Sequence, residues 1–257
     1  MLKPSPLLDQ LKKARGLLHG GATVTDHLAI YRLEESLNKH QELMLTNPAL
    51  MDEVLVFWRE VSVFRGKGCQ IMAIHISRTL SYIARCGSTE ITNRLDAAEQ
   101  TLDQALAAKD GPVIQTRLDC LARLVKEATA FVQGPLSRSR HLSDLRANFW
   151  LILSAACNLI KDPALLELTL KTVRNAKAND IERMAAIETL EAYFGDDLEI
   201  SQEAEDALNS ICDHPKKAGR SLLVTALQTK IDFGIGCELG ALDAVDEWKD
   251  EHEPGRW

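Results

Sequence analysis

Residues that start and stop helices punctuate residues 162–234 more regularly than any other part of the chain. Asp162 and Pro163 form one start signal, because an oxygen-bearing N-cap precedes a proline whose missing N–H is not needed at the first helical position. Asn179 is a second N-cap, and the glutamate three residues later completes a capping-box pattern. Gly195 is suited to end that helix, because glycine adopts positive φ without a Cβ clash. These signals predict successive helices joined by short turns.

Further start signals at Ser201 and Pro215 give two pairs of helices in this stretch. The distance from Pro163 to Ser201 is 38 residues (201 − 163), and that from Asp180 to Pro215 is 35 residues (215 − 180). A two-helix unit of this length is typical of stacked helical repeats. The segment 180–195, with small and aliphatic residues at helical spacing, resembles the second helix of a HEAT or armadillo repeat.

This resemblance is confined to residues 162–234 and implies an α-solenoid, in which antiparallel helix pairs stack and shield one another's apolar faces. A compact irregular helical bundle is the alternative architecture. The composition favours an all-α fold, because aromatic residues make up only 5% of the chain and runs of β-branched residues are few. We therefore predict an all-α protein of about eleven or twelve helices.

The first half of the chain is also expected to be helical. Apolar residues at helical spacing predict helices over residues 6–19, 25–44, 49–64, 69–85, 88–109 and 113–132. In this interpretation Gly87 ends the fourth of these helices, and Pro48 opens the third.

The glycine-, proline- and serine-containing segment after residue 133 is the expected boundary between two regions. An N-terminal helical region would cover residues 1–134, and a HEAT-like helical-repeat region would cover residues 142–234. Ser143 would cap the first helix of the second region, whose apolar residues 145–160 would lie at its centre. An acidic C-terminal helix and tail would cover residues 235–257.

Metal, cofactor and catalytic motifs are missing from the sequence. The six cysteines and seven histidines have no spacing used by metal ligands, and no glycine-rich phosphate loop is present. Cys212 and His214 are two residues apart, so they would not face each other on a helix. His75 lies in an apolar stretch and is expected to be half-buried with a hydrogen-bond partner. We expect no metal and no cofactor.

Scattered cysteines without short pairings favour a reduced, cytoplasmic protein. The longest apolar run, residues 149–160, is too short to span a bilayer, so no membrane partner is expected. Charge is unevenly distributed: residues 181–257 hold 7 Lys and Arg against 18 Asp and Glu, which is a net charge of −11. Such an acidic region repels phosphate backbones and disfavours nucleic acid as its partner.

Two groups of residues are candidates for partner binding. A basic cluster in and after the boundary segment could bind an acidic protein or nucleic acid, although a solvated linker is the alternative interpretation. Tryptophans near the acidic C-terminus could contact a partner protein. These candidate binding residues are Arg138, Arg140, His141, Arg146, Trp248 and Trp257.

The sequence favours a non-catalytic protein-binding adaptor, scaffold or assembly factor that uses a helical-repeat surface. One alternative is a HEAT-like nucleic-acid-acting protein that uses the basic cluster near Arg140, with Trp150 as its aromatic side chain. A second alternative is a helical enzyme or ligand-binding bundle, because a site assembled from distant helices leaves no local motif.

Overall fold

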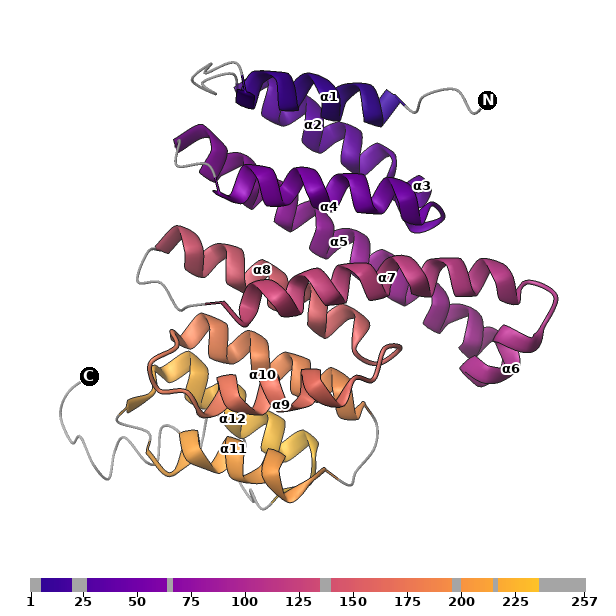
Figure 1. Ribbon diagram of the computed structural model, residues 1–257. Coiled ribbons are helices and arrows are strands. Elements are labelled where there is room, and N and C mark those ends of the chain that lie inside the picture. Colours follow the sequence, from indigo (N-terminus) through magenta and orange to yellow (C-terminus); the bar gives the residue numbers. More distant parts are fainter. Residues whose placement is uncertain are drawn as a thin grey trace. The chain divides into compact units, whose positions relative to one another are not determined.

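A computed structural model of the chain describes residues 6–19, 27–63, 67–134, 140–195, 200–214 and 217–235. Within these ranges it contains twelve α-helices and no strand, which confirms the all-α prediction (Figure 1). The helices are α1 (Pro6–His19), α2 (His27–Lys39), α3 (Gln41–Leu45), α4 (Pro48–Val63), α5 (Lys67–Ala98), α6 (Leu102–Ala107), α7 (Gly111–Val132), α8 (Arg140–Ala156), α9 (Pro163–Arg174), α10 (Asp180–Phe194), α11 (Gln202–Cys212) and α12 (Arg220–Asp232). Among the described helices, none combines the length and the apolar character needed to cross a bilayer.

The helices fall into two units, each with its own contacts. Unit 1 comprises residues 1–134 and 139–160 and holds α1 to α8. In this unit α1 contacts α2, α4 contacts α5, and α7 contacts α8. The contacts also run between pairs, because α4 lies against both α1 and α7, and α5 lies against both α2 and α8. Unit 1 therefore contains two rows of helices, with α1, α4 and α7 in front of α2, α5 and α8 in Figure 1.

An aromatic cluster joins three helices in the core of unit 1. Trp58 of α4 packs edge-on against Phe131 of α7, with ring centroids 5.1 Å apart, and against Phe149 of α8 at 4.5 Å. Trp58 and Phe149 are fully buried, as is Trp150. Edge-to-face pairs of this kind add about 0.5–1.5 kcal/mol each beyond the area that they bury. Trp150 is thus a core residue and does not present its ring to a partner.

Unit 2, described by α9 to α12, repeats the pairing on a smaller scale. Here α9 contacts α10 and α11 contacts α12, while α9 also lies against α11 and α10 against α12. The predicted caps of this unit are confirmed. The side chains of Asp162, Asn179 and Ser201 accept hydrogen bonds from the backbone N–H groups of the helices that follow them. Gly195 ends α10 with φ 59°, as predicted for a glycine C-cap.

Several predicted helix boundaries in the first half are wrong. Residues 25–44 form two helices and not one, because the chain leaves helical geometry at His40. The helix predicted for residues 88–109 does not exist as a unit, since α5 continues to Ala98 and α6 begins only after the N-cap Thr101. Glu99 takes up the break with φ 50°.

Gly87 does not end a helix. It lies inside α5, where a Cβ would be 2.7 Å from Leu45 Cδ2 and 3.4 Å from Leu121 Cδ2. The glycine therefore allows close approach of α5 to α3 and α7, and helix termination was the wrong interpretation of it. A buried glycine in a helix and a glycine at a helix end are alike in sequence, and only the packing separates them.

Two helix starts and the grouping of α8 also differ from the sequence interpretation. Helix α8 begins at Arg140, so Ser143 lies within its first turn, and α12 begins at Arg220 after the N-cap Gly219 and not at Pro215. The boundary predicted after residue 134 would place α8 with the second region. In the structure α8 packs against α5 and α7, and it therefore belongs to unit 1.

Candidate functional site

Arg146, the best described of the predicted binding residues, is buried and caps a helix. The residue is only 4% exposed. The guanidinium donates from Nη2 to the carbonyl of Val132 at 2.5 Å, and from Nη1 to the carbonyls of Gly134 at 3.0 Å and Phe131 at 3.4 Å. These carbonyls lie at the carboxyl end of α7, where a cation is favoured by the helix dipole. Arg146 therefore stabilises the α7–α8 turn and does not lie on the surface.

The other predicted binding residues remain predictions. Arg140 and His141 lie in the first turn of α8, but their side chains are outside the described part of the chain. Arg138, Trp248 and Trp257 lie outside the described residues altogether. Of the predicted basic cluster, the structure therefore describes only the side chain of Arg146, which is buried.

His75 lies in unit 1, whereas Cys212 and His214 lie in unit 2. The side chain of His75 is partly exposed, as expected, and its Nδ1 lies 2.9 Å from Glu34 Oε2. This contact lacks hydrogen-bond geometry, so the expected hydrogen-bond partner of Nδ1 is not found. Within the described ranges, no group of three or more histidine, cysteine or acidic side chains is arranged to hold a metal ion. Cys212 is the last residue of α11, and His214 follows that helix.

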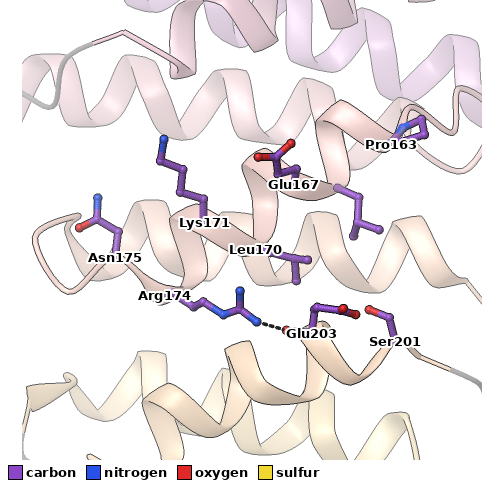
Figure 2. A pocket seen from close by; sticks show the side chains of 9 residues that line it. Pro163, Glu167, Leu170, Lys171, Arg174, Asn175, Ser201 and Glu203 are labelled. Atoms are coloured by element: carbon purple, nitrogen blue, oxygen red, sulfur yellow. Dashed lines mark hydrogen bonds between the residues drawn. The ribbon is translucent and has the colours of Figure 1, made fainter.

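An open groove of about 620 Å³ lies between α9 and the start of α11 in unit 2 (Figure 2). Its volume falls in the range of small-ligand and peptide sites. Leu166 and Leu170 give it an apolar floor, and charged side chains of both signs surround that floor. The lining residues are Pro163, Leu166, Glu167, Leu170, Lys171, Arg174, Asn175, Ser201 and Glu203. We call this site the α9–α11 groove.

Three polar residues of the α9–α11 groove are held by the backbone. Arg174 Nη2 donates to the carbonyl of Glu203 at 2.6 Å, which links the end of α9 to the start of α11. Ser201 Oγ accepts from the N–H of Ala204 as the N-cap of α11, and Asn175 Oδ1 accepts from the N–H of Lys177. In Figure 2 Leu170 and Arg174 point toward Ser201 and Glu203. These bonds fix the walls of the groove.

The remaining charges of the groove are available to a ligand. Glu167 and Lys171 are exposed one turn apart on α9, and neither has an ion-pair partner among the described residues. Both point away from α11 in Figure 2. No histidine, cysteine or tyrosine lines the groove, and its one hydroxyl, that of Ser201, serves as a helix cap. The groove therefore offers contact surface and opposite charges, and its carboxylates and amine belong to Glu167, Glu203 and Lys171.

The α9–α11 groove was not predicted, although the sequence contains part of its signal. The exposed positions 167, 171 and 174 of α9 could be read from the predicted helix, because residues at this spacing share one face. The pairing of α9 with the start of α11 could not be predicted, since it depends on how one helix pair packs on the next.

No known protein family matches the chain, and neither a curated protein nor a solved structure is similar to it.

Glu188 and the half-buried Glu191 lie on α10, which does not line the groove. Burial raises the pKa of Glu191 above its ordinary value of 4.5; the hydrogen bond from the Thr229 hydroxyl lowers that pKa, and the nearby carboxylates of Asp232 and Glu188 raise it further. Burial likewise raises the pKa of Glu188. An acid whose pKa is raised by folding destabilises the folded state once it is ionised.

We expect Glu191→Gln to make the protein more stable than the wild type at pH 7. The folded-state pKa of Glu191 is above its unfolded value, so stability is lost as pH rises from about 4.5 through the raised pKa. Glutamine removes that loss and still accepts the Thr229 hydrogen bond. Thermal unfolding at pH 7 and pH 4 measures the difference, which should vanish at the lower pH. A less stable variant at pH 7, or an equal difference at both pH values, would show that the ionised carboxylate does not destabilise the folded state.

Proposed function

We propose that this protein is a non-catalytic scaffold that binds another protein, and that each of its units is a stack of antiparallel helix pairs of the HEAT-like kind. The stack is supported by the contacts within each unit, where every helix pair lies against the next pair through both of its helices. Helix pairs stacked in this way leave one face of each row for partners.

The α9–α11 groove is the observation that carries the proposal of protein binding. Its floor of Leu166 and Leu170 would receive an apolar side chain, while Glu167 and Lys171 would pair with opposite charges on either side of it. A peptide segment of a partner protein supplies both features along one short stretch, as in helix-in-groove recognition. The open mouth and the fixed walls favour a segment of a macromolecule over an enclosed small molecule.

Photo-crosslinking from inside the groove tests this function. A benzophenone amino acid placed at Leu166 should form a covalent product with one protein in the native cell, because that side chain lies on the groove floor. The matched control is the same amino acid at Ile181, which is 57% exposed on α10 of the same unit but does not line the groove. Mass spectrometry of the product identifies the partner.

The outcome distinguishes specific binding in the groove from nonspecific binding elsewhere on the protein. A product from position 166 that is absent from position 181 supports the groove, provided that the purified partner binds the full chain. Equal products from both positions, or a product that contains nucleic acid, would contradict a protein-binding groove. Leu166→Asp should abolish capture by a benzophenone placed at Lys171, while circular dichroism shows that the helices remain intact.

A further inference from the structure

Two arginines and a tyrosine share the outer face of α5 in unit 1. Arg78, Tyr82 and Arg85 are all exposed and are separated by four and three residues, so they lie along one side of the helix. Tyr82 is 53% exposed, although tyrosines usually bury most of their ring. The Cys86 and Arg85 side chains lie beside the Tyr82 hydroxyl and act on its pKa.

Helix α8 extends this face with an apolar residue. The Asn148 amide donates to Ser77 Oγ at 3.0 Å, and Ser88 Oγ donates to Asn158 Oδ1 at 3.2 Å. The two pairs are 71 and 70 residues apart in sequence, so α5 and α8 run parallel and in register. Leu151 is 43% exposed on α8 between these two contacts. We call Arg78, Tyr82, Arg85 and Leu151 the α5–α8 face.

The positive charge of this face is not neutralised by the protein itself. No described carboxylate forms an ion pair with Arg78 or Arg85, and the described outward residues of α8 carry no charge. Several other arginines of unit 1 have acidic partners: Arg59 with Glu127, Arg94 with Glu90, and Arg123 with Asp52. The exposed Arg32 of α2, like Arg78 and Arg85, has no ion-pair partner among the described residues. The α5–α8 face therefore presents two unpaired guanidinium groups on one side of a single helix.

We propose that the α5–α8 face binds an acidic segment of a partner protein. Arg78 and Arg85 each hold a carboxylate, which a guanidinium can bind through two parallel hydrogen bonds. Tyr82 and Leu151 pack against an apolar side chain that lies between those carboxylates. Tyrosine and arginine are the residue types that most often dominate the energy of protein interfaces. This surface lies in unit 1 and is separate from the α9–α11 groove of unit 2.

The spacing of the charges fits a peptide. Arg78 and Arg85 are seven residues apart, which is about 10 Å along a helix. Two acidic residues separated by three positions on an extended chain, or by seven on a helix, span about the same distance. A short segment with two acidic residues around one apolar residue is therefore complementary to the face.

Nucleic acid fits the same face less well. Two arginines neutralise two phosphates, whereas proteins that bind duplex DNA firmly neutralise about 6–10 of them. The chain as a whole carries a net charge of −7, which repels a phosphate backbone. Leu151 also offers an aliphatic contact where a nucleic-acid site would place a further cation or a stacking ring.

Selection of peptides on the full chain tests the proposal. Random dodecapeptides displayed on phage should yield binders that are acidic and contain an aliphatic or aromatic residue between two carboxylates. In fluorescence titrations, Arg78→Glu/Arg85→Glu should weaken these binders by about 30-fold or more, because two attractive pairs become repulsive. Tyr82→Ala/Leu151→Ala should weaken them about tenfold or more through lost apolar contact.

A charge-matched control and a reciprocal selection make the result decisive. Lys12→Glu/Lys126→Glu makes the same change in net charge at exposed positions of α1 and α7 and should leave binding unchanged. Selection on Arg78→Glu/Arg85→Glu should enrich basic peptides instead of acidic ones. Neutral or basic binders on the wild type, equal losses in the control, or tighter binding of a single-stranded oligothymidylate would overturn the proposal. Leu166→Asp leaves this binding intact whether or not the groove of unit 2 binds a protein.

Discussion

Gly111→Ala is expected to destabilise unit 1 by about 2–3 kcal/mol. Gly111 is buried at the start of α7, and an added Cβ would lie 2.0 Å from the carbonyl oxygen of Leu106 and 2.7 Å from its carbonyl carbon. These are backbone atoms at the end of α6, so no side chain can rotate to relieve the overlap. The turn between the two helices must move, and the higher helix propensity of alanine does not offset that cost.

The same substitution at Gly16 is the matched control for Gly111→Ala. A Cβ at Gly16 would have no other atom within 4 Å, and the residue is exposed within α1. Gly16→Ala should therefore stabilise the protein by up to about 1 kcal/mol. Denaturant unfolding in a Trp248→Phe/Trp257→Phe background follows unit 1 through its two buried tryptophans, Trp58 and Trp150. Equal stability of Gly111→Ala and the wild type would mean that the α6–α7 turn is not tightly packed.

Arg146→Ala is expected to lower the free energy of unfolding by about 2–4 kcal/mol. The substitution removes a buried cation and leaves the carbonyls of Phe131, Val132 and Gly134 without their guanidinium donor. Those carbonyls end α7, and the turn from α7 to α8 depends on them. The same denaturant unfolding experiment, read through Trp58 and Trp150, measures the loss.

Two further variants separate hydrogen bonding from charge at this position. Arg146→Lys keeps the cation but not the planar set of donors, so it should recover only part of the loss. Arg78→Ala removes an exposed arginine with no described partner and should change stability by less than about 0.5 kcal/mol. If Arg146→Ala were as mild as Arg78→Ala, the guanidinium would not be holding the end of α7.

Local chemistry explains which features could be predicted from the sequence. Asp162, Asn179 and Ser201 act as N-caps through hydrogen bonds to residues two or three positions away, so the whole interaction is visible in a short stretch of sequence. Gly195 adopts positive φ for an equally local reason. The all-α class follows from the same patterns repeated along the chain.

Features that depend on packing between distant segments were not visible. The close approach of Leu45 and Leu121 explains why Gly87 stays inside α5, and both residues are far from it in sequence. Arg146 looked like a surface cation because sequence shows its charge but not the carbonyls of α7 that surround it. The floor of the α9–α11 groove and the partner helix that closes it are likewise joined only in three dimensions.

The affinity of the partner captured through Leu166 for the full chain is the most direct measure of protein binding by the α9–α11 groove. Glu167→Lys/Lys171→Glu keeps the net charge of −7 and the composition but exchanges the two charges beside the groove floor. In calorimetric titrations we expect this variant to bind the partner at least about tenfold more weakly than the wild type, because each charge would face a like charge. Unchanged affinity after the exchange would contradict the assignment of this groove as the binding site.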